Sequence, residues 1–89
     1  MKDKLKMKAK TIIAEHGYET DLTEEVDLPL RQGQILHGIL DGLYNNQIAK
    51  MLGISIKTVE KHRCLLFSTL NISRGNEVFL KICKKMKKN

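Results

Sequence analysis

Several features are scarce or absent in this sequence, and each absence excludes a class of protein. No apolar run approaches the length needed to cross a bilayer, and the start, MKDKLKMKAK, has no apolar core of the kind that a secretory signal carries. We therefore expect a cytoplasmic protein without a membrane partner. Because the chain has only 89 residues, we expect one small domain, with no room for a separate sensory or catalytic domain.

Cysteine is scarce as well. Cys64 and Cys83 form neither a spaced pair nor a multi-cysteine framework, so we expect both to remain thiols in a reducing compartment. His62 lies two residues from Cys64, and such side chains on a helix point about 200° apart, which makes them poor co-ligands for a metal. No nucleophile, base and orienting residue share a recognisable motif. The sequence therefore predicts neither an enzyme nor a metal site, and it indicates no cofactor.

Charge is divided unevenly along the chain. Residues 1–27 carry 5 lysines against 7 acidic residues, a net charge of −2, whereas residues 28–89 carry 11 basic against 3 acidic residues, a net charge of +8. The basic part is where a polyanion would bind. An anionic membrane surface would be attracted by the same charge, so the sign alone does not choose between lipid and nucleic acid.

The amino-terminal segment predicts one amphipathic helix. The spacing of a single apolar stripe is shared by Leu5, Ala9, Ile12 and Ile13. Asp3 can cap the start of this helix and Gly17 can end it. The alternative is a frayed basic arm, because chain termini are often disordered. Residues 19–27 follow as an acidic connector, in which residues 21–24 have a capping-box pattern that would support one helical turn before Pro29.

From Leu28 onward, the pattern predicts three consecutive helices. The first ends near Gly42, and its apolar positions are Ile35, Leu36, Ile39, Leu40 and Leu43. Asn45 is a favourable cap for a short second helix, and Gly53 supplies the positive φ of a sharp turn. Ser55 then caps a third helix, over residues 56–70, which buries Val59, Leu66 and Leu70 and ends at Asn71.

A final helix is expected from about residue 76 to residue 86. No segment alternates with the period of two that a half-buried strand requires. The sequence therefore predicts an all-α fold. Its second and third helices, joined by a tight glycine-containing turn, form the arrangement that presents a helix to the major groove of DNA.

The third helix carries a ridge of small and basic side chains opposite its buried positions. At 100° per residue, the members of this ridge are Lys57, Lys61, Cys64 and Ser68. Glu60 lies on its flank. A ridge of this kind can enter a groove about 12 Å wide, where lysines contact phosphates or guanine edges and a glutamate accepts from a cytosine amine. The alternative is an ordinary solvated face.

Residues 28–78 resemble the LuxR/GerE/NarL family of helix-turn-helix domains. The motifs that carry the resemblance are DGLYN at 41–45, IA at 48–49, LGIS at 52–55 and KTVEKHR at 57–63. The resemblance implies four helices, with the third in the major groove and the fourth commonly forming a two-fold dimer. It also implies transcriptional regulation in a bacterium.

The expected architecture is therefore an all-α, four-helix helix-turn-helix domain of LuxR/GerE type with an additional amino-terminal helix. We expect residues 1–27 to hold that helix and the acidic connector. Residues 28–89 would hold the helix-turn-helix domain and a basic carboxyl-terminal tail.

The resemblance also assigns roles by position. It implies base-reading roles for Glu60, Lys61 and Cys64. It implies phosphate-anchoring roles for Asn45, Ser55, Lys57, Thr58 and His62. The chain departs from the family in Gln32, Gly33 and Gly75, where relatives usually have glutamate, arginine and arginine, and in Ser68 and Thr69, where basic residues are common. Fewer basic residues mean fewer phosphate contacts, so we expect DNA affinity below the family norm.

The predicted final helix has a wide apolar arc. We expect a dimer interface formed by Val78, Phe79, Ile82, Cys83 and Met86. In the alternative, the apolar stripe of the amino-terminal helix covers this arc within the same chain.

We interpret the chain as a stand-alone transcriptional regulator that binds double-stranded DNA as a homodimer through its third helix. The alternative is an interaction module that modulates another regulatory protein and has weak or no specific DNA binding. The departures at Gln32, Gly33, Ser68 and Gly75 motivate that alternative.

Overall fold

The computed structural model describes residues 7–20, 22, 24–71 and 84–85, and the following account is confined to them. Their helices are α1 (Ala9–Glu15), α2 (Leu30–Leu40), α3 (Asn45–Leu52) and α4 (Ile56–Leu70). Their strands, of two residues each, are β1 (Met7–Lys8), β2 (Tyr18–Glu19), β3 (Asp27–Leu28) and β4 (Lys84–Lys85). Within these ranges, none of the helices combines the length and the apolar character that crossing a membrane would require.

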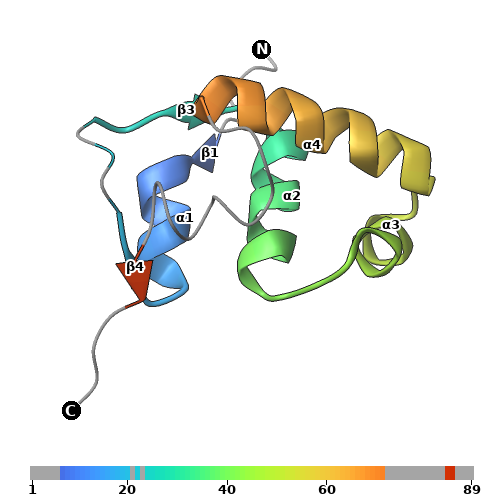
Figure 1. Ribbon diagram of the computed structural model, residues 1–89, viewed down its shortest axis with the longest axis horizontal. Coiled ribbons are helices and arrows are strands. Elements are labelled where there is room, and N and C mark those ends of the chain that lie inside the picture. Colours follow the sequence, from blue (N-terminus) through green and yellow to red (C-terminus); the bar gives the residue numbers. More distant parts are fainter. Residues whose placement is uncertain (1–6, 21, 23, 72–83, 86–89) are drawn as a thin grey trace.

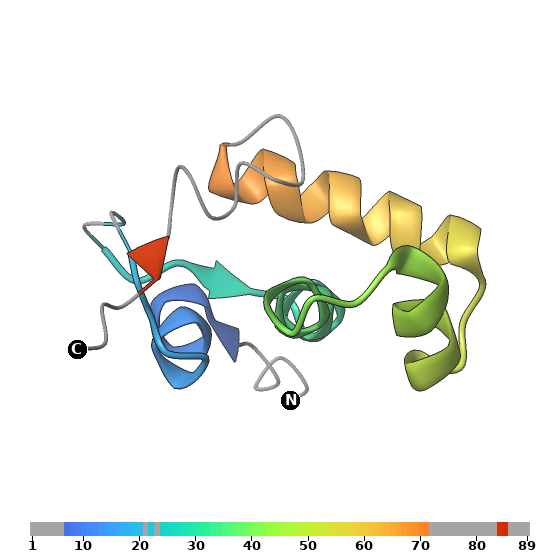
Figure 2. The same ribbon diagram turned by 60° about the horizontal axis from the view of Figure 1, so that its bottom comes forward.

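Helix α2 lies at the centre of the fold. Helix α1 packs on one side of it, and α4 contacts both α2 and α3. Figure 1 shows α4 running from α3 at one end to β3 at the other, and Figure 2 shows α1, α2 and α3 in a row with α4 lying over α2 and α3. The core is shared among all four helices, and its fully buried members include Ile13, Ile35, Ile48 and Val59.

The helices from α2 to α4 follow the predicted pattern closely. The predicted apolar positions Ile35, Leu36, Ile39 and Leu40 of α2 are all buried. The turn between α3 and α4 passes through Gly53, whose φ of 71° lies in the left-handed region that glycine adopts without a steric penalty. Helix α4 ends at Asn71, which has a φ of 61° and a ψ of 46°, as expected for an asparagine at a helix end.

The predicted cap of α3 was wrong by one residue. Tyr44, not Asn45, is the N-cap, and its backbone N–H donates to Oε1 of Gln47 at 2.8 Å. Asn45 is the first helical residue, and its side chain turns toward α4. Tyr44 can take the place of Asn45 as the N-cap because Gln47, at the third helical position, reaches back to the free Tyr44 N–H at the start of the helix.

The expectation that the chain has no strand was also wrong. In β1 and β3, Met7 pairs with Leu28 and Lys8 with Asp27, and in β2 and β4, Tyr18 pairs with Lys85 and Glu19 with Lys84. Strands of two residues are too short to show an alternating pattern, and each of these pairs joins segments that are distant in sequence. Lys84 and Lys85 are therefore extended, where the predicted final helix would have included them. Residues 76–83 and 86 of that helix lie outside the described residues.

Helix α1 begins later than predicted, because a distant carboxylate caps it. Met7 and Lys8 are extended, and Glu25 accepts from the backbone N–H of Lys10 at 2.6 Å and from the Thr11 hydroxyl at 3.1 Å. The predicted cap, Asp3, lies outside the described residues. A carboxylate at a helix start satisfies free N–H groups and opposes the helix dipole favourably. This cap comes from 15 residues away, so local pattern reading does not find it.

The described residues of the acidic connector contain no helical turn, although one was predicted. Of the predicted turn at 21–24, residues 22 and 24 are described, and neither is helical. The neighbouring residues Glu25 and Val26 are occupied by α1, because the Val26 carbonyl accepts from the Ala9 N–H at 2.9 Å. These tertiary contacts override the local capping-box pattern.

Helix α1 is docked on α2, not frayed. Of its predicted stripe, Ala9, Ile12 and Ile13 are 0%, 2% and 0% exposed, and they belong to one core cluster with residues of α2. Leu5, the fourth member of the stripe, lies outside the described residues. The amino-terminal segment thus buries its apolar side against its own chain.

Two glycines of α2 let its neighbours approach closely. A Cβ at Gly33 would overlap the Met7 side chain of β1, and one at Gly38 would lie 2.7 Å from Cγ1 of Ile48 in α3. Gly33, a position where the resemblance implied arginine, therefore gives the amino-terminal segment its place on α2. This packing role of Gly33 was not predicted from the sequence.

We expect Gly33→Ala to destabilise the fold. Overpacking costs about 1–3 kcal/mol, which outweighs the roughly 1 kcal/mol that alanine gains over glycine in a helix. In a Met7→Ala background, part of the overlap is removed, and the same substitution should be less destabilising. Urea unfolding of the wild type, the two single variants and the double variant measures the change in the free energy of unfolding that Gly33→Ala causes with and without Met7.

Gly38→Ala is the matched control for this cycle, because its overlap is with Ile48 and not with Met7. Its effect on the free energy of unfolding should be the same with and without Met7→Ala. Equal effects of Met7→Ala on both glycine substitutions would contradict the proposed contact between Met7 and Gly33.

Candidate nucleic-acid interface

Helix α4 begins at a well-formed cap. The Ser55 hydroxyl accepts from the Thr58 N–H at 3.1 Å and lies 2.9 Å from the Thr58 hydroxyl. Val59, Leu66 and Leu70 then face the core and are buried. Because these three positions anchor one side of α4 on α2 and α3, the opposite side faces solvent.

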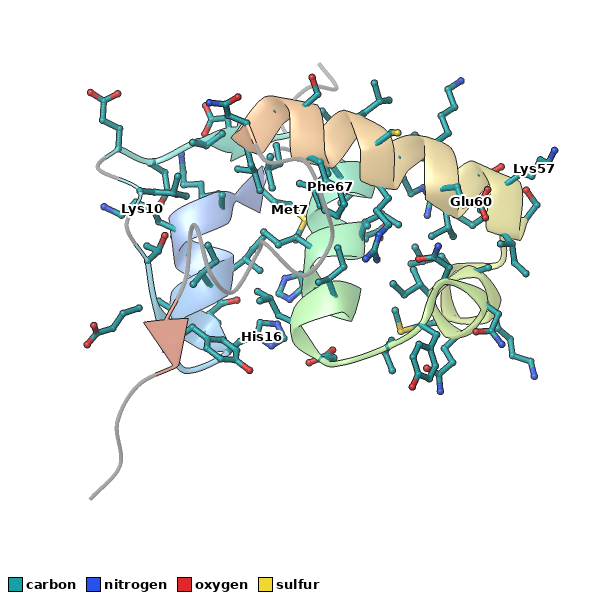
Figure 3. The ribbon with its side chains drawn as sticks, viewed as in Figure 1. Met7, Lys10, His16, Lys57, Glu60 and Phe67 are labelled. Atoms are coloured by element: carbon teal, nitrogen blue, oxygen red, sulfur yellow. The ribbon has the colours of Figure 1, made fainter. Side chains whose placement is uncertain are left out.

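The exposed side of α4 carries the predicted ridge. Lys57, Lys61, Cys64 and Ser68 are all exposed, and so is Glu60 on its flank. Figure 3 shows Lys57 and Glu60 at the end of α4 that lies nearest α3. Neither Lys57 nor Lys61 forms an ion pair with a described residue. Their charges are therefore not neutralised by this part of the chain.

The remaining predicted contact residues surround the start of α3 and α4. Ser55 is exposed, whereas Asn45, Thr58 and His62 are partly buried. Asn45 comes from the first turn of α3, and the other three come from the first two turns of α4 or its cap. The structure thus places Ser55 and Thr58 at the turn between the two helices, whereas Asn45 lies at the other end of α3, beside Arg63.

Arg63 was not predicted as a site residue, and it links these two helices. Its Nη1 donates to Oδ1 of Asn45 at 3.2 Å, and its Cζ lies 5.1 Å from the centre of the Phe67 ring. Burial lowers the pKa of the Arg63 guanidinium, although an arginine in a protein stays charged at neutral pH. The sequence signal for the ring contact is the spacing of four residues between Arg63 and Phe67 on one helix.

An open hollow lies beside this arginine. Its volume is about 400 Å³, and it is lined by Leu43, Tyr44, Asn45, Asn46, Ile56 and Arg63. Tyr44 and Ile56 are exposed apolar residues at its edge, with 74% and 46% of their surfaces accessible. The hollow therefore gives solvent a route to the Arg63–Asn45 contact.

Gln32 ties α2 to the far half of α4. It is 8% exposed, and its Oε1 accepts from the Thr69 hydroxyl at 3.2 Å. Thr69 also lies 2.9 Å from the Leu65 carbonyl, so its single proton serves one of the two acceptors at a time. Gln32 and Thr69 are two positions where the resemblance implied other residues, and here they are partners.

A second polar cluster joins α1 to the end of α2. Nε2 of His16 lies 2.8 Å from Nδ1 of His37, and Nδ1 of His16 lies 3.1 Å from the Asp41 carboxylate. Figure 3 places His16 well away from Lys57 and Glu60. Asp41 and His37 bond opposite nitrogens of His16, so the three do not converge on one point. In the described ranges, no group of three or more potential ligands is placed to hold a metal ion.

We expect Ser55→Ala to lower the free energy of unfolding by about 1 kcal/mol, because it removes the oxygen that caps α4. Ser68→Ala is the control, since Ser68 is an exposed residue inside the same helix and alanine is favourable there. Chemical denaturation followed by circular dichroism measures both. Equal stability of the two variants would contradict the capping role.

Known proteins resemble most of this chain. A model of the luxR family of bacterial regulatory proteins, GerE, matches residues 27–80, which is more than half of the chain. The uncharacterized response regulatory protein YgeK of Escherichia coli (strain K12) is 33% identical over 76 residues, which cover 85% of this chain and 48% of YgeK. The chain thus spans about half the length of that relative. No solved structure matches the chain.

Proposed function

Because the chain belongs to the luxR family of bacterial regulatory proteins, we propose that it binds duplex DNA with α4 in the major groove and regulates transcription in this way. The family match confirms the resemblance inferred from the motifs of residues 28–78. The observation that carries the proposal is the exposed ridge of α4, formed by Lys57, Lys61, Cys64 and Ser68. Its position beside the tight turn after α3 supports the proposal, because a recognition helix is presented in this way.

The exposed groups suggest how the work is divided between bases and backbone. Lys61 can donate to the acceptors of a guanine edge, and Glu60 can accept from a cytosine amine. Cys64, about one turn farther along the helix, adds a small neutral surface. Contacts to phosphates, which fix the register on the duplex, are proposed for Asn45, Ser55, Lys57, Thr58 and His62.

The structure weakens one argument for the alternative, in which the chain is a pure interaction module. Gln32 and Gly33 have partners within the chain, Thr69 and Met7, which account for their identity without a loss of DNA reading. Of the other two departures in that argument, Ser68 is exposed on the ridge and Gly75 lies outside the described residues. The alternative is retained as an outcome of the experiment below.

The test is fluorescence anisotropy of a labelled random duplex at low salt. Nonspecific dissociation constants of DNA-binding proteins are about 1–100 μM at physiological salt, and they fall as salt is lowered. We therefore expect binding by tens of micromolar protein. An absence of binding at that concentration would sink the proposal and favour the interaction module.

We further expect Lys57→Ala and Lys61→Ala each to weaken binding. A lysine on a phosphate releases about one counterion, so its loss flattens the plot of log affinity against log salt by roughly one unit. A lysine on a base edge should instead change affinity among DNA sequences. Lys10→Ala is the control, because Lys10 lies on α1, away from Lys57 (Figure 3). If Lys10→Ala flattened the plot of log affinity against log salt as much as Lys57→Ala and Lys61→Ala do, that result would contradict a local interface on α4.

A homodimer is also part of this proposal, and it is supported by the apolar spacing of Val78, Phe79, Ile82, Cys83 and Met86. These residues lie outside the described residues. The division of the chain at residue 28 into an amino-terminal segment and a DNA-binding part is likewise proposed.

Light scattering after size exclusion should give a mass of about twice the monomer's 10.2 kDa. Phe79→Glu should restore the monomer, whereas the exposed Leu65→Glu on α4 should not. A monomeric wild type at concentrations that bind DNA would contradict the dimer. Selection of bound sequences from a random pool adds a second measure, because a dimer selects palindromic half-sites about one helical turn apart.

A further inference from the structure

Arg63 differs from the other basic residues of α4. Lys57 and Lys61 are exposed on the ridge, whereas Arg63 is partly buried behind it. A guanidinium is removed from water only where other groups satisfy it, and here they are the Asn45 side chain and the Phe67 ring. Its position therefore calls for a role other than simple surface charge.

The two contacts of Arg63 have different partners and different effects. Phe67 comes from the same helix and lies 5.1 Å from the guanidinium carbon, which orients the arginine within α4. Asn45 is the first residue of α3, and its Oδ1 accepts from Nη1 at 3.2 Å. The arginine therefore holds the start of α3 against the middle of α4.

This contact determines which end of the Asn45 carboxamide faces outward. A guanidinium has only donors, so the amide atom that faces it must be the oxygen. The amide nitrogen, with its two donors, is then left for other partners. It lies at the start of α3, where the first backbone N–H groups also lack partners within the helix.

We propose that Arg63 is a positioning residue that acts through Asn45. It holds the Asn45 carboxamide with its nitrogen outward, where that nitrogen donates to a DNA phosphate. This role rests on the proposed DNA binding, and it means that Arg63 orients the amide nitrogen of Asn45 as the donor to the phosphate. Arg63 itself makes no phosphate contact.

A direct phosphate contact by Arg63 is the competing arrangement, because the hollow beside it is open to solvent. The two arrangements differ in their response to salt. A charged side chain on a phosphate releases a counterion, and its loss lowers the salt slope by about one unit. A neutral carboxamide releases none, so the loss of a positioning arginine leaves the slope unchanged.

The experiment is a double-mutant cycle in DNA affinity across a salt series. Arg63→Met and Asn45→Ala should each weaken binding about ten- to hundredfold, the usual loss for one hydrogen bond to a charged partner. The double variant should be no weaker than either single variant, because the two residues act as one unit. The salt slope should equal that of the wild type in all three. Denaturation curves establish that each protein is folded at the assay temperature.

Arg31→Met is the matched control. Arg31 is also a partly buried arginine, and its Nη1 donates to Oε1 of Gln34 at 3.0 Å, within α2. Its removal deletes an equivalent hydrogen bond far from Asn45 in the chain, and it should leave DNA affinity unchanged.

Asn45→Asp provides a second test that does not depend on how well Arg63→Met folds. Aspartate keeps an oxygen for the contact with Arg63 and is favourable in the first turn of a helix, but it presents a carboxylate oxygen where the amide nitrogen would donate. We expect it to lose at least tenfold in affinity. Unchanged affinity in Asn45→Asp would overturn the proposal.

The other outcomes are also decisive. Affinity losses that multiply in the double variant, or a slope that falls by one unit in Arg63→Met, would show a direct contact and overturn the positioning role. Wild-type affinity in Arg63→Met would overturn it while leaving the proposed DNA binding intact. Failure of the wild type to bind DNA would remove both.

Discussion

The close packing of α2 against its neighbours is the constraint on which the remainder of the structure depends. Ile35 and Leu36 are fully buried, and the bare backbone at Gly33 and Gly38 lets Met7 and Ile48 approach from two sides. Packed interiors tolerate neither voids nor overlap, so this small helix sets where α1, α3 and α4 lie. The exposed ridge of α4 is a consequence of that placement, because its opposite side is used by the core.

Polar contacts then connect the packed helices in pairs. Arg63 joins α4 to the start of α3, and Gln32 joins α2 to Thr69 near the end of α4. A polar group that is buried without a partner is costly, so each of these contacts favours one arrangement over its neighbours. The ridge is thus carried on a helix that is held at its middle and near its end, which suits the proposed role of α4 as a rigid recognition helix.

The amino-terminal segment belongs to the same core as the family domain. Its strand β1 pairs with β3, Glu25 caps α1, and His16 contacts His37 and Asp41 at the end of α2. All of these partners are more than ten residues apart, so no local sequence pattern pairs them. The segment is consequently part of the scaffold on which α2 rests, and Gly33 is the feature of α2 that admits it.

The sequence by itself determined the helices from α2 to α4, because apolar spacing, Gly53, Ser55 and Asn71 act through contacts within a few residues. It also determined that Lys57, Lys61 and Cys64 share one exposed ridge, since helix geometry follows from residue number alone. The tertiary structure decided the late start of α1, the paired strands and the burial of Arg63. Each of these depends on a group brought close by folding, such as Glu25 beside Lys10 or Asn45 beside Arg63, and separation along the chain hides such pairs from pattern reading.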